Sequence, residues 1–172
     1  MILTTERLQL REMIGEDLPF LASMLADPET MRFYPSVLDA AEARAWLERQ
    51  LGRYASYGHG WWLVERRTPP HEPIGQVGLT MQEVDGSLVP EIGYMIQRSN
   101  WRQGFAAEAA IGVRDHAFDV RGYDRVISLI RPENLPSQRV AARMGMTPET
   151  MTMFRGYPHR IHAIRRTERP VV

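Results

Sequence analysis

Residues 91–108 place a turn of small residues between a predicted strand and a predicted helix, an arrangement that can bind phosphate groups. The backbone N–H groups of residues 101–106 would be free at the start of the helix, where the helix dipole also favours an anion. Gly104 permits torsion angles, or a close approach, that a side chain would block, and Ala106 and Ala107 leave room above the first turn. The pattern predicts a pyrophosphate site, although an ordinary turn glycine before a core helix would explain the same residues.

Two common phosphate motifs do not fit this turn. A P-loop requires Lys followed by Ser or Thr directly after its last glycine, whereas Phe105 and Ala106 follow Gly104. The dinucleotide fingerprint requires three spaced glycines, and this turn has Gly104 alone. Nucleoside triphosphate chemistry and a Rossmann domain are therefore not indicated.

A second informative segment covers residues 127–146. A predicted strand at 127–130 leads into a loop that contains Asn134, and Ser137 is expected to open a short helix that Gly145 closes. Val140, Ala141 and Met144 would lie on one face of that helix.

Together the two segments resemble the GNAT superfamily of acyl-CoA-dependent N-acyltransferases. The turn motif of that family reads Arg or Gln, two residues of any type, Gly, any residue, then Gly or Ala; here the string is Trp101-Arg102-Gln103-Gly104-Phe105-Ala106. Trp in the first place is common in the branch typified by the ribosomal-protein N-terminal acetyltransferases RimJ and RimL, whose Trp-x-x-Gly-Phe/Tyr-Ala-x-Glu-Ala string is similar to residues 101–109. Residues 3–11 and 91–94 look like the first and fourth strands of that branch.

The resemblance implies acetyl-CoA as cosubstrate. It places the thioester carbonyl and pantetheine arm against the fourth strand, the pyrophosphate on the turn amides, and Asn134 and Ser137 near the pantetheine and the sulfur. The implied cofactor-binding residues are Tyr94, Met95, Ile96, Trp101, Arg102, Gln103, Gly104, Phe105, Ala106, Ala107, Asn134 and Ser137.

Amide formation from a thioester requires a route for the amine proton, a polarising donor for the carbonyl oxygen and protonation of the departing thiolate. Many family members carry a Tyr as acid seven residues after the Asn, where this chain has Ala141. Ser137, or water held by it, is then the candidate proton donor, unless Ser137 simply caps its helix. Glu91 is the candidate base, with a solvated strand-end carboxylate as the alternative, and His59 is a weaker candidate.

On the acceptor side, aromatic residues fall in segments that line the amine site in relatives, although core packing would also explain them. These residues are Phe33, Tyr34, Trp61 and Trp62. A predicted C-terminal hairpin adds polar groups that would suit an acidic acceptor or a solvated face: Arg155, Tyr157, His159, Arg160 and His162.

Composition limits the remaining possibilities. The 172 residues suit a single domain over 1–172, and 21 basic against 21 acidic residues give no reason to expect nucleic acid or a membrane as partner. The chain has no Cys, so disulfides and thiolate metal sites are excluded, and no metal is expected. No leader or long apolar run is present, so a cytoplasmic location is the default.

The expected fold is α/β (α+β), with a mixed central sheet of about seven strands flanked by about four helices. Strands are expected near 7–13, 61–66, 74–82, 91–96, 127–130, 147–154 and 159–166, and helices near 15–26, from residue 40, over 104–120 and over 137–145. The predicted function is acetyl transfer to a primary amine, a protein N-terminus or a small amine, in a ternary complex. The alternatives are a polyamine, amino-acid analogue or aminoglycoside as acceptor, or a noncatalytic acyl-CoA-sensing module; a homodimer is possible because dimers are common in the family.

Overall fold

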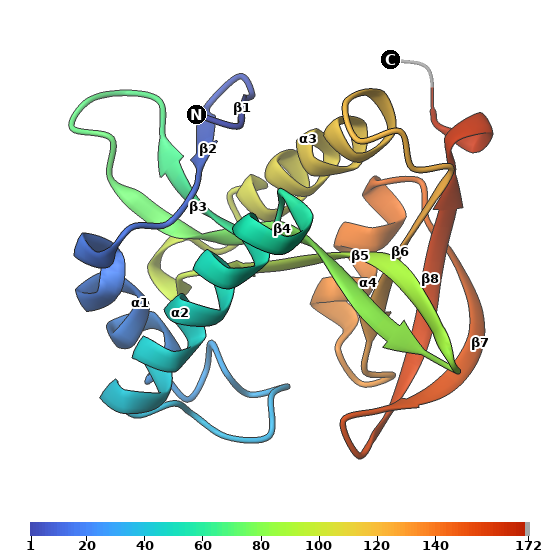
Figure 1. The fold of residues 1–172 in the computed structure, drawn as a ribbon, viewed down its shortest axis with the longest axis horizontal. Helices are drawn as coiled ribbons and strands as arrows, with labels where there is room; N and C mark the ends of the chain where they lie inside the picture. The colour runs from blue at the N-terminus through green and yellow to red at the C-terminus, as the bar shows by residue number, and fades with distance from the viewer. Residues whose placement is uncertain (171–172) are drawn as a thin grey trace.

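The computed structural model describes residues 1–170, which form one mixed sheet with helices on both faces (Figure 1). The strands are β1 (Leu3–Thr4), β2 (Leu8–Arg11), β3 (Trp61–Arg66), β4 (Pro73–Val84), β5 (Ser87–Ile96), β6 (Arg125–Ile130), β7 (Thr147–Phe154) and β8 (Tyr157–Arg165). Their order in the sheet is β1-β2-β3-β4-β5-β6-β8-β7. The expected fold is confirmed, with one strand more than predicted because Leu3 and Thr4 fold back to pair with Leu10 and Gln9.

Four α-helices accompany the sheet: α1 (Leu18–Leu25), α2 (Ala40–Tyr57), α3 (Phe105–Asp119) and α4 (Leu135–Arg143). Asp39 and Glu42 begin α2 by exchanging side-chain to backbone hydrogen bonds of 2.9 and 2.8 Å, a capping box that their spacing indicates. The first helix starts later than expected, because residues Gly15–Asp17 form a short 3-10 turn before it.

The sheet separates two hydrophobic layers, and alternation along β3 assigns its residues to them. Trp61 and Leu63 pack with α1 and α2 on one face, whereas Trp62 and Val64 pack with α3 and α4 on the other. The same alternation places Met95 of β5 in the first layer. Adjacent tryptophans therefore belong to different cores.

Strands β5 and β6 separate at the centre of the sheet. The β4–β5 hairpin turns at Asp85 and Gly86, which have φ angles of +49° and +78°, and β5 then runs parallel to β6. The described ladder between β5 and β6 holds a single residue pair, Glu91 with Ile127. Beyond that pair both strands continue, to Ile96 and Ile130, without pairing to each other, so the carboxyl end of β5 has an open edge.

No helix within residues 1–170 combines the length and apolar character needed to cross a membrane.

Candidate functional site

A cleft of about 570 Å³ opens where β5 and β6 separate. Its walls come from β5, the turn before α3, the end of β6, the start of α4, the loop after α1 and the β7–β8 turn. The structure brings together here most of the residues predicted for the site: Phe33, Tyr34, Trp61, Glu91, Tyr94, Met95, Ile96, Trp101, Arg102, Gly104, Phe105, Ala106, Ala107, Asn134 and Ser137.

Trp62 does not line the cleft, contrary to the prediction. Its side chain is fully buried and its ring meets His116 of α3 edge-on, with the centroids 5.4 Å apart. The reason is the alternation of β3, which sends Trp61 toward the cleft and Trp62 into the opposite core.

His59 is also removed from the catalytic candidates. It is fully buried, and its ring nitrogens lie 2.8 Å from the Leu79 carbonyl oxygen and 2.8 Å from the Tyr123 hydroxyl. Burial lowers the pKa of His59. Although Gly58 and Gly60 flank it, His59 is a residue of the buried core.

The turn before α3 depends on the backbone conformation of Gly104. Its φ of +83° lies in the left-handed region, while a Cβ built there would meet nothing nearer than Arg7 Nη2 at 3.4 Å, an ordinary contact. Positive φ is thus a structural reason for glycine at this position. The indole N–H of Trp101 donates to the Ile96 carbonyl oxygen at 2.6 Å and fastens the turn to the end of β5.

A network from the turn between β1 and β2 supports the turn before α3. The Glu108 carboxylate, in the first turn of α3, accepts hydrogen bonds from the Arg7 N–H at 2.8 Å, Arg7 Nε at 2.7 Å and the Thr5 hydroxyl at 2.5 Å. Burial opposes ionisation of Glu108, but these hydrogen bonds prevail and its pKa lies below the ordinary value. Arg7 Nη1 also donates to the Gln103 carbonyl oxygen at 3.0 Å. Gln103 therefore lies in this network and, contrary to the prediction, does not line the cleft.

This network was not anticipated from the sequence. Glu108 stands in the Trp-x-x-Gly-Phe-Ala-x-Glu-Ala string and Arg7 in the opening strand, but no local pattern connects residues 101 positions apart. The guanidinium groups of Arg7 and Arg66 also lie over the Phe105 ring, 4.6 and 4.8 Å from its centroid.

At the other side of the cleft, Asn134 rather than Ser137 caps α4. Asn134 Oδ1 accepts a hydrogen bond of 3.1 Å from the Ser137 backbone N–H, and the helix begins at Leu135. The capping explanation of Ser137 is therefore wrong. The Ser137 carbonyl oxygen accepts from the Tyr94 hydroxyl at 2.7 Å, which joins β5 to α4 across the cleft. Burial, together with the Glu91 charge, raises the pKa of Tyr94 and keeps this donor protonated.

Glu91 is buried at the level where β5 and β6 separate. Glu91 is 8% exposed. Its Oε2 accepts hydrogen bonds from Gln82 Nε2 at 2.9 Å and from Thr80 Oγ1 at 3.2 Å. The alternative of a solvated strand-end carboxylate is thereby contradicted. A carboxylate held by two donors and lining the cleft is oriented toward whatever binds there.

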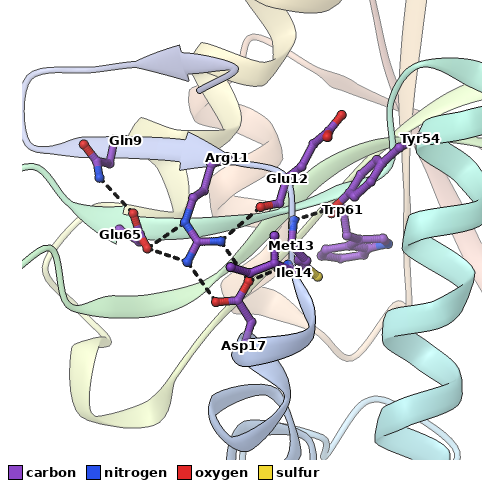
Figure 2. A network of polar contacts seen from close by, with 9 residues as sticks. All are labelled: Gln9, Arg11, Glu12, Met13, Ile14, Asp17, Tyr54, Trp61 and Glu65. Carbon is purple, nitrogen blue, oxygen red and sulfur yellow. Dashed lines mark hydrogen bonds and ion pairs between the residues drawn. The ribbon is translucent and has the colours of Figure 1, made fainter.

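Polar contacts surround the backbone of Trp61 and the neighbouring residues of β2 and β3 (Figure 2). The Tyr54 hydroxyl of α2 donates to the Trp61 carbonyl oxygen and accepts from the Met13 N–H at 3.2 Å. Beside it, the Arg11 guanidinium bridges the carboxylates of Asp17 and Glu65, each at 2.8 Å. These contacts join β2, β3 and α2 and so fix the backbone position of Trp61.

Gly93 of β5 makes the position of Trp61 possible. A Cβ at Gly93 would lie 2.3 Å from Cζ2 of the Trp61 indole, which overlaps van der Waals radii. Trp46 of α2 also packs against that ring, at a centroid distance of 5.8 Å. The indole is therefore confined between α2 and β5.

Positive charge gathers in the cleft although the whole chain is balanced. Seven arginines and two glutamates line it: Arg32, Arg53, Arg102, Arg131, Arg139, Arg143 and Arg155, with Glu29 and Glu91. Of the predicted hairpin residues, Arg155, Tyr157 and His159 reach the cleft, whereas Arg160 and His162 do not.

Comparison with known proteins assigns this architecture to a family. The family model described as an acetyltransferase (GNAT) domain matches residues 7–147. The chain belongs to the GNAT acetyltransferase family. This confirms the predicted enzyme class, an acyltransferase.

Relatives agree with the GNAT assignment. YkkB of Bacillus subtilis (strain 168), an uncharacterized protein, is 36% identical over 146 residues, which cover 84% of each chain. A GNAT-family acetyltransferase from Bacillus anthracis has a similar structure, with a TM-score of 0.83, 22% identity and coverage of 98% of this chain and 100% of the other. The ribosomal L7/L12 acetyltransferase RimL, solved in complex with coenzyme A, has a TM-score of 0.77 at 17% identity and covers 95% of this chain and 97% of its own.

Among residues 1–170, no three His, Cys, Asp or Glu side chains are grouped as a metal ion would require.

Proposed function

We propose that the protein transfers an acetyl group from acetyl-CoA to a primary amine by direct attack in a ternary complex. The observation that carries this proposal is the separation of β5 and β6, which opens an unpaired strand edge between the turn before α3 and the start of α4. In that turn the N–H groups of residues 102–106 donate to no acceptor among the described residues, whereas the N–H of Trp101, expected to be free, donates to the Arg98 carbonyl oxygen at 3.2 Å. Glu91 lies at the inner end of that opening. One cleft thus contains the open edge of β5, the turn before α3 and the buried carboxylate of Glu91.

The residues present fit coenzyme A chemically. The open edge of β5 near Tyr94 offers backbone groups to the amides of the pantetheine arm, and the turn at Gly104 offers N–H groups to the pyrophosphate. Arg102, Arg139 and Arg143 line the cleft and provide positive charge for phosphate groups. RimL, a structural neighbour, binds coenzyme A.

Acetyl-CoA supplies an activated thioester carbonyl when it is bound. In the proposed reaction, Glu91 takes the proton of the acceptor ammonium directly or through water, which frees the nitrogen lone pair for attack. The C–N bond forms as the C–S bond breaks, and the sulfur leaves as a thiolate. Ser137, or water held by it, gives a proton to that sulfur and takes in exchange the second proton that the nitrogen loses as the amide forms.

The position of Ser137 supports this role. Because Asn134 caps α4, the Ser137 hydroxyl is not consumed by capping. Ala141, which stands where many relatives carry a Tyr acid, is fully buried and has no proton to give. Ser137 is the cleft-lining hydroxyl nearest in sequence to that position on α4.

We also propose the branch of the family and the class of acceptor amine. The Trp-x-x-Gly-Phe-Ala string supports a RimJ/RimL-type branch, with a protein N-terminus or a small amine as acceptor. Polyamines and aminoglycosides are rival acceptors, and a noncatalytic acyl-CoA sensor is the rival from another class.

The test is release of free thiol from acetyl-CoA with a panel of peptides, amino acids, polyamines and aminoglycosides. The protein has no Cys, so its own thiol background is absent. Release that depends on one amine class supports the enzyme and names the class. Tight acetyl-CoA binding by calorimetry without release for any amine would favour the sensor, and absence of binding would refute the proposal.

A further inference from the structure

We call the part of the cleft formed by the loop after α1, α2 and the β7–β8 turn its acceptor end. Three arginines there have no carboxylate partner among the described residues. Within residues 1–170, none of Arg32, Arg53 and Arg155 lies within 4.0 Å of an Asp or Glu oxygen, whereas Arg131, at the same end, pairs with Glu133 at 2.7 Å. Free guanidinium groups that line a cleft are available to bind a ligand.

Arg53 on α2 and Arg155 at the β7–β8 turn both line the cleft, and each contacts a residue of its own element. Arg53, half-buried on α2, donates at 3.1 Å to Oε1 of Gln50, a fully buried residue whose Nε2 donates to the Trp46 carbonyl oxygen. Arg155, at the β7–β8 turn with φ of +51°, lies over the Phe154 ring at 5.1 Å.

These two cations and Glu91 are close enough to affect one another. Burial lowers the pKa of Arg53, the Arg155 charge lowers it further, and Glu91 opposes the effect. The Glu91 carboxylate itself is occupied by Gln82 and Thr80, not by an arginine. Arg53 and Arg155 therefore line the same cleft as Glu91 without being paired to it.

The acceptor end is also enclosed. Arg131 Nη1 lies 3.5 Å from the Phe33 carbonyl oxygen and its guanidinium lies 4.7 Å from the centre of the Tyr157 ring. This side chain therefore joins the loop after α1, the end of β6 and the C-terminal hairpin, all of which line the cleft with Glu91. Such an enclosure suits a small molecule better than a polypeptide.

We propose that the acceptor is a small amine that also carries an oxyanion, a carboxylate or a phosphate, with its amine toward Glu91 and its oxyanion between Arg53 and Arg155. This inference rests on the proposed acetyltransferase function. The planar guanidinium fork matches both oxyanions, and the same two charges repel a polycation such as a polyamine or an aminoglycoside.

The experiment measures acetylation of matched acceptor pairs. An amino acid is compared with its amide, and an aminoalkyl phosphate with the corresponding amino alcohol; a polyamine and an acidic peptide complete the panel. We expect KM to be lower by about tenfold or more for the charged member of one pair, and the pair that shows the difference distinguishes carboxylate from phosphate.

Variants then connect the preference to the two arginines. Arg53→Gln and Arg155→Gln should each raise KM for the charged acceptor about tenfold while leaving KM for the neutral analogue and the Kd of acetyl-CoA unchanged. Arg44→Gln, at an exposed position of the same helix as Arg53, is the matched control and should change neither value. Thermal melting checks folding, and Arg155, on an exposed turn, provides a readout even if the Arg53 variant unfolds.

Several outcomes would overturn the inference alone: equal KM within each pair, preference for the polyamine, acetylation of the peptide but of no small amine, or a charge preference that both variants retain. Failure of every amine to release thiol would instead overturn the acetyltransferase proposal, and this inference with it.

Discussion

Gly104→Ala tests whether the turn before α3 works through its backbone. The residue has a φ of +83° and ψ of −2°, a conformation that costs a non-glycine residue about 1–2 kcal/mol. Steric overlap adds little, because the new Cβ would lie 3.4 Å from Arg7 Nη2. If the turn relaxes to relieve the strain, its amides rotate. Loss of one charge-assisted hydrogen bond to a phosphate, about 1.5–3 kcal/mol, corresponds to a Kd roughly 10-fold to 150-fold higher.

Gly122→Ala provides a matched control for this substitution. Gly122 has a φ of +73°, nothing lies within 4 Å of the Cβ that would be added, and it does not line the cleft. Both variants should therefore lose similar stability in urea unfolding, about 1–2 kcal/mol. By calorimetry, Gly104→Ala alone should bind acetyl-CoA more weakly. Wild-type affinity in Gly104→Ala, with both variants equally destabilised, would show that the turn amides do not bind the cosubstrate.

Further substitutions test the catalytic and structural roles. Ser137→Ala should lower kcat by about 100-fold or more, the range of general acid–base catalysis, without changing the Kd of acetyl-CoA. Unchanged turnover would remove Ser137 from the mechanism. Glu91→Gln should alter the pH–rate profile, and an identical profile would reject Glu91 as base. Glu108→Gln should be less stable than wild type at neutral pH, as measured by urea unfolding. Because the pKa of Glu108 is lower in the folded state than in the unfolded chain, the difference in stability should persist above about pH 4.5. It should vanish as the pH falls through the pKa of the folded state. Burial lowers the pKa of His59 in the folded protein. Below about pH 6.5 the imidazole is therefore protonated in the unfolded chain before it is protonated in the folded one. Wild type should then lose more stability on acidification from that pH than His59→Gln, and parallel losses would contradict this account.

Local sequence rules determined much of the framework. The Asp39–Glu42 capping box, the Asp85-Gly86 hairpin turn and the positive φ of Gly104 each depend on a few neighbouring residues, so their conformations follow from residue type. The strand-turn-helix motif at 91–108 and the resemblance built on it identified the family that the comparisons confirm.

Tertiary structure decided which of these residues face the cleft. Alternation states that Trp61 and Trp62 point to opposite faces, but only the packing of α2 and α3 on those faces shows which of them meets the site. Glu91 could have been solvated or buried, and its burial results from Thr80 and Gln82 on the paired strand β4.

Contacts between distant segments were beyond any local pattern. Arg7 meets Glu108 only when β2 packs beside α3. Arg53 and Arg155 line one cleft only because α2 and the β7–β8 turn both reach it. A residue's type and neighbours set its local conformation, whereas its distant partners depend on how the whole chain packs. For that reason the sequence identified the chemistry of this protein, and the fold revealed the charges that would select its acceptor.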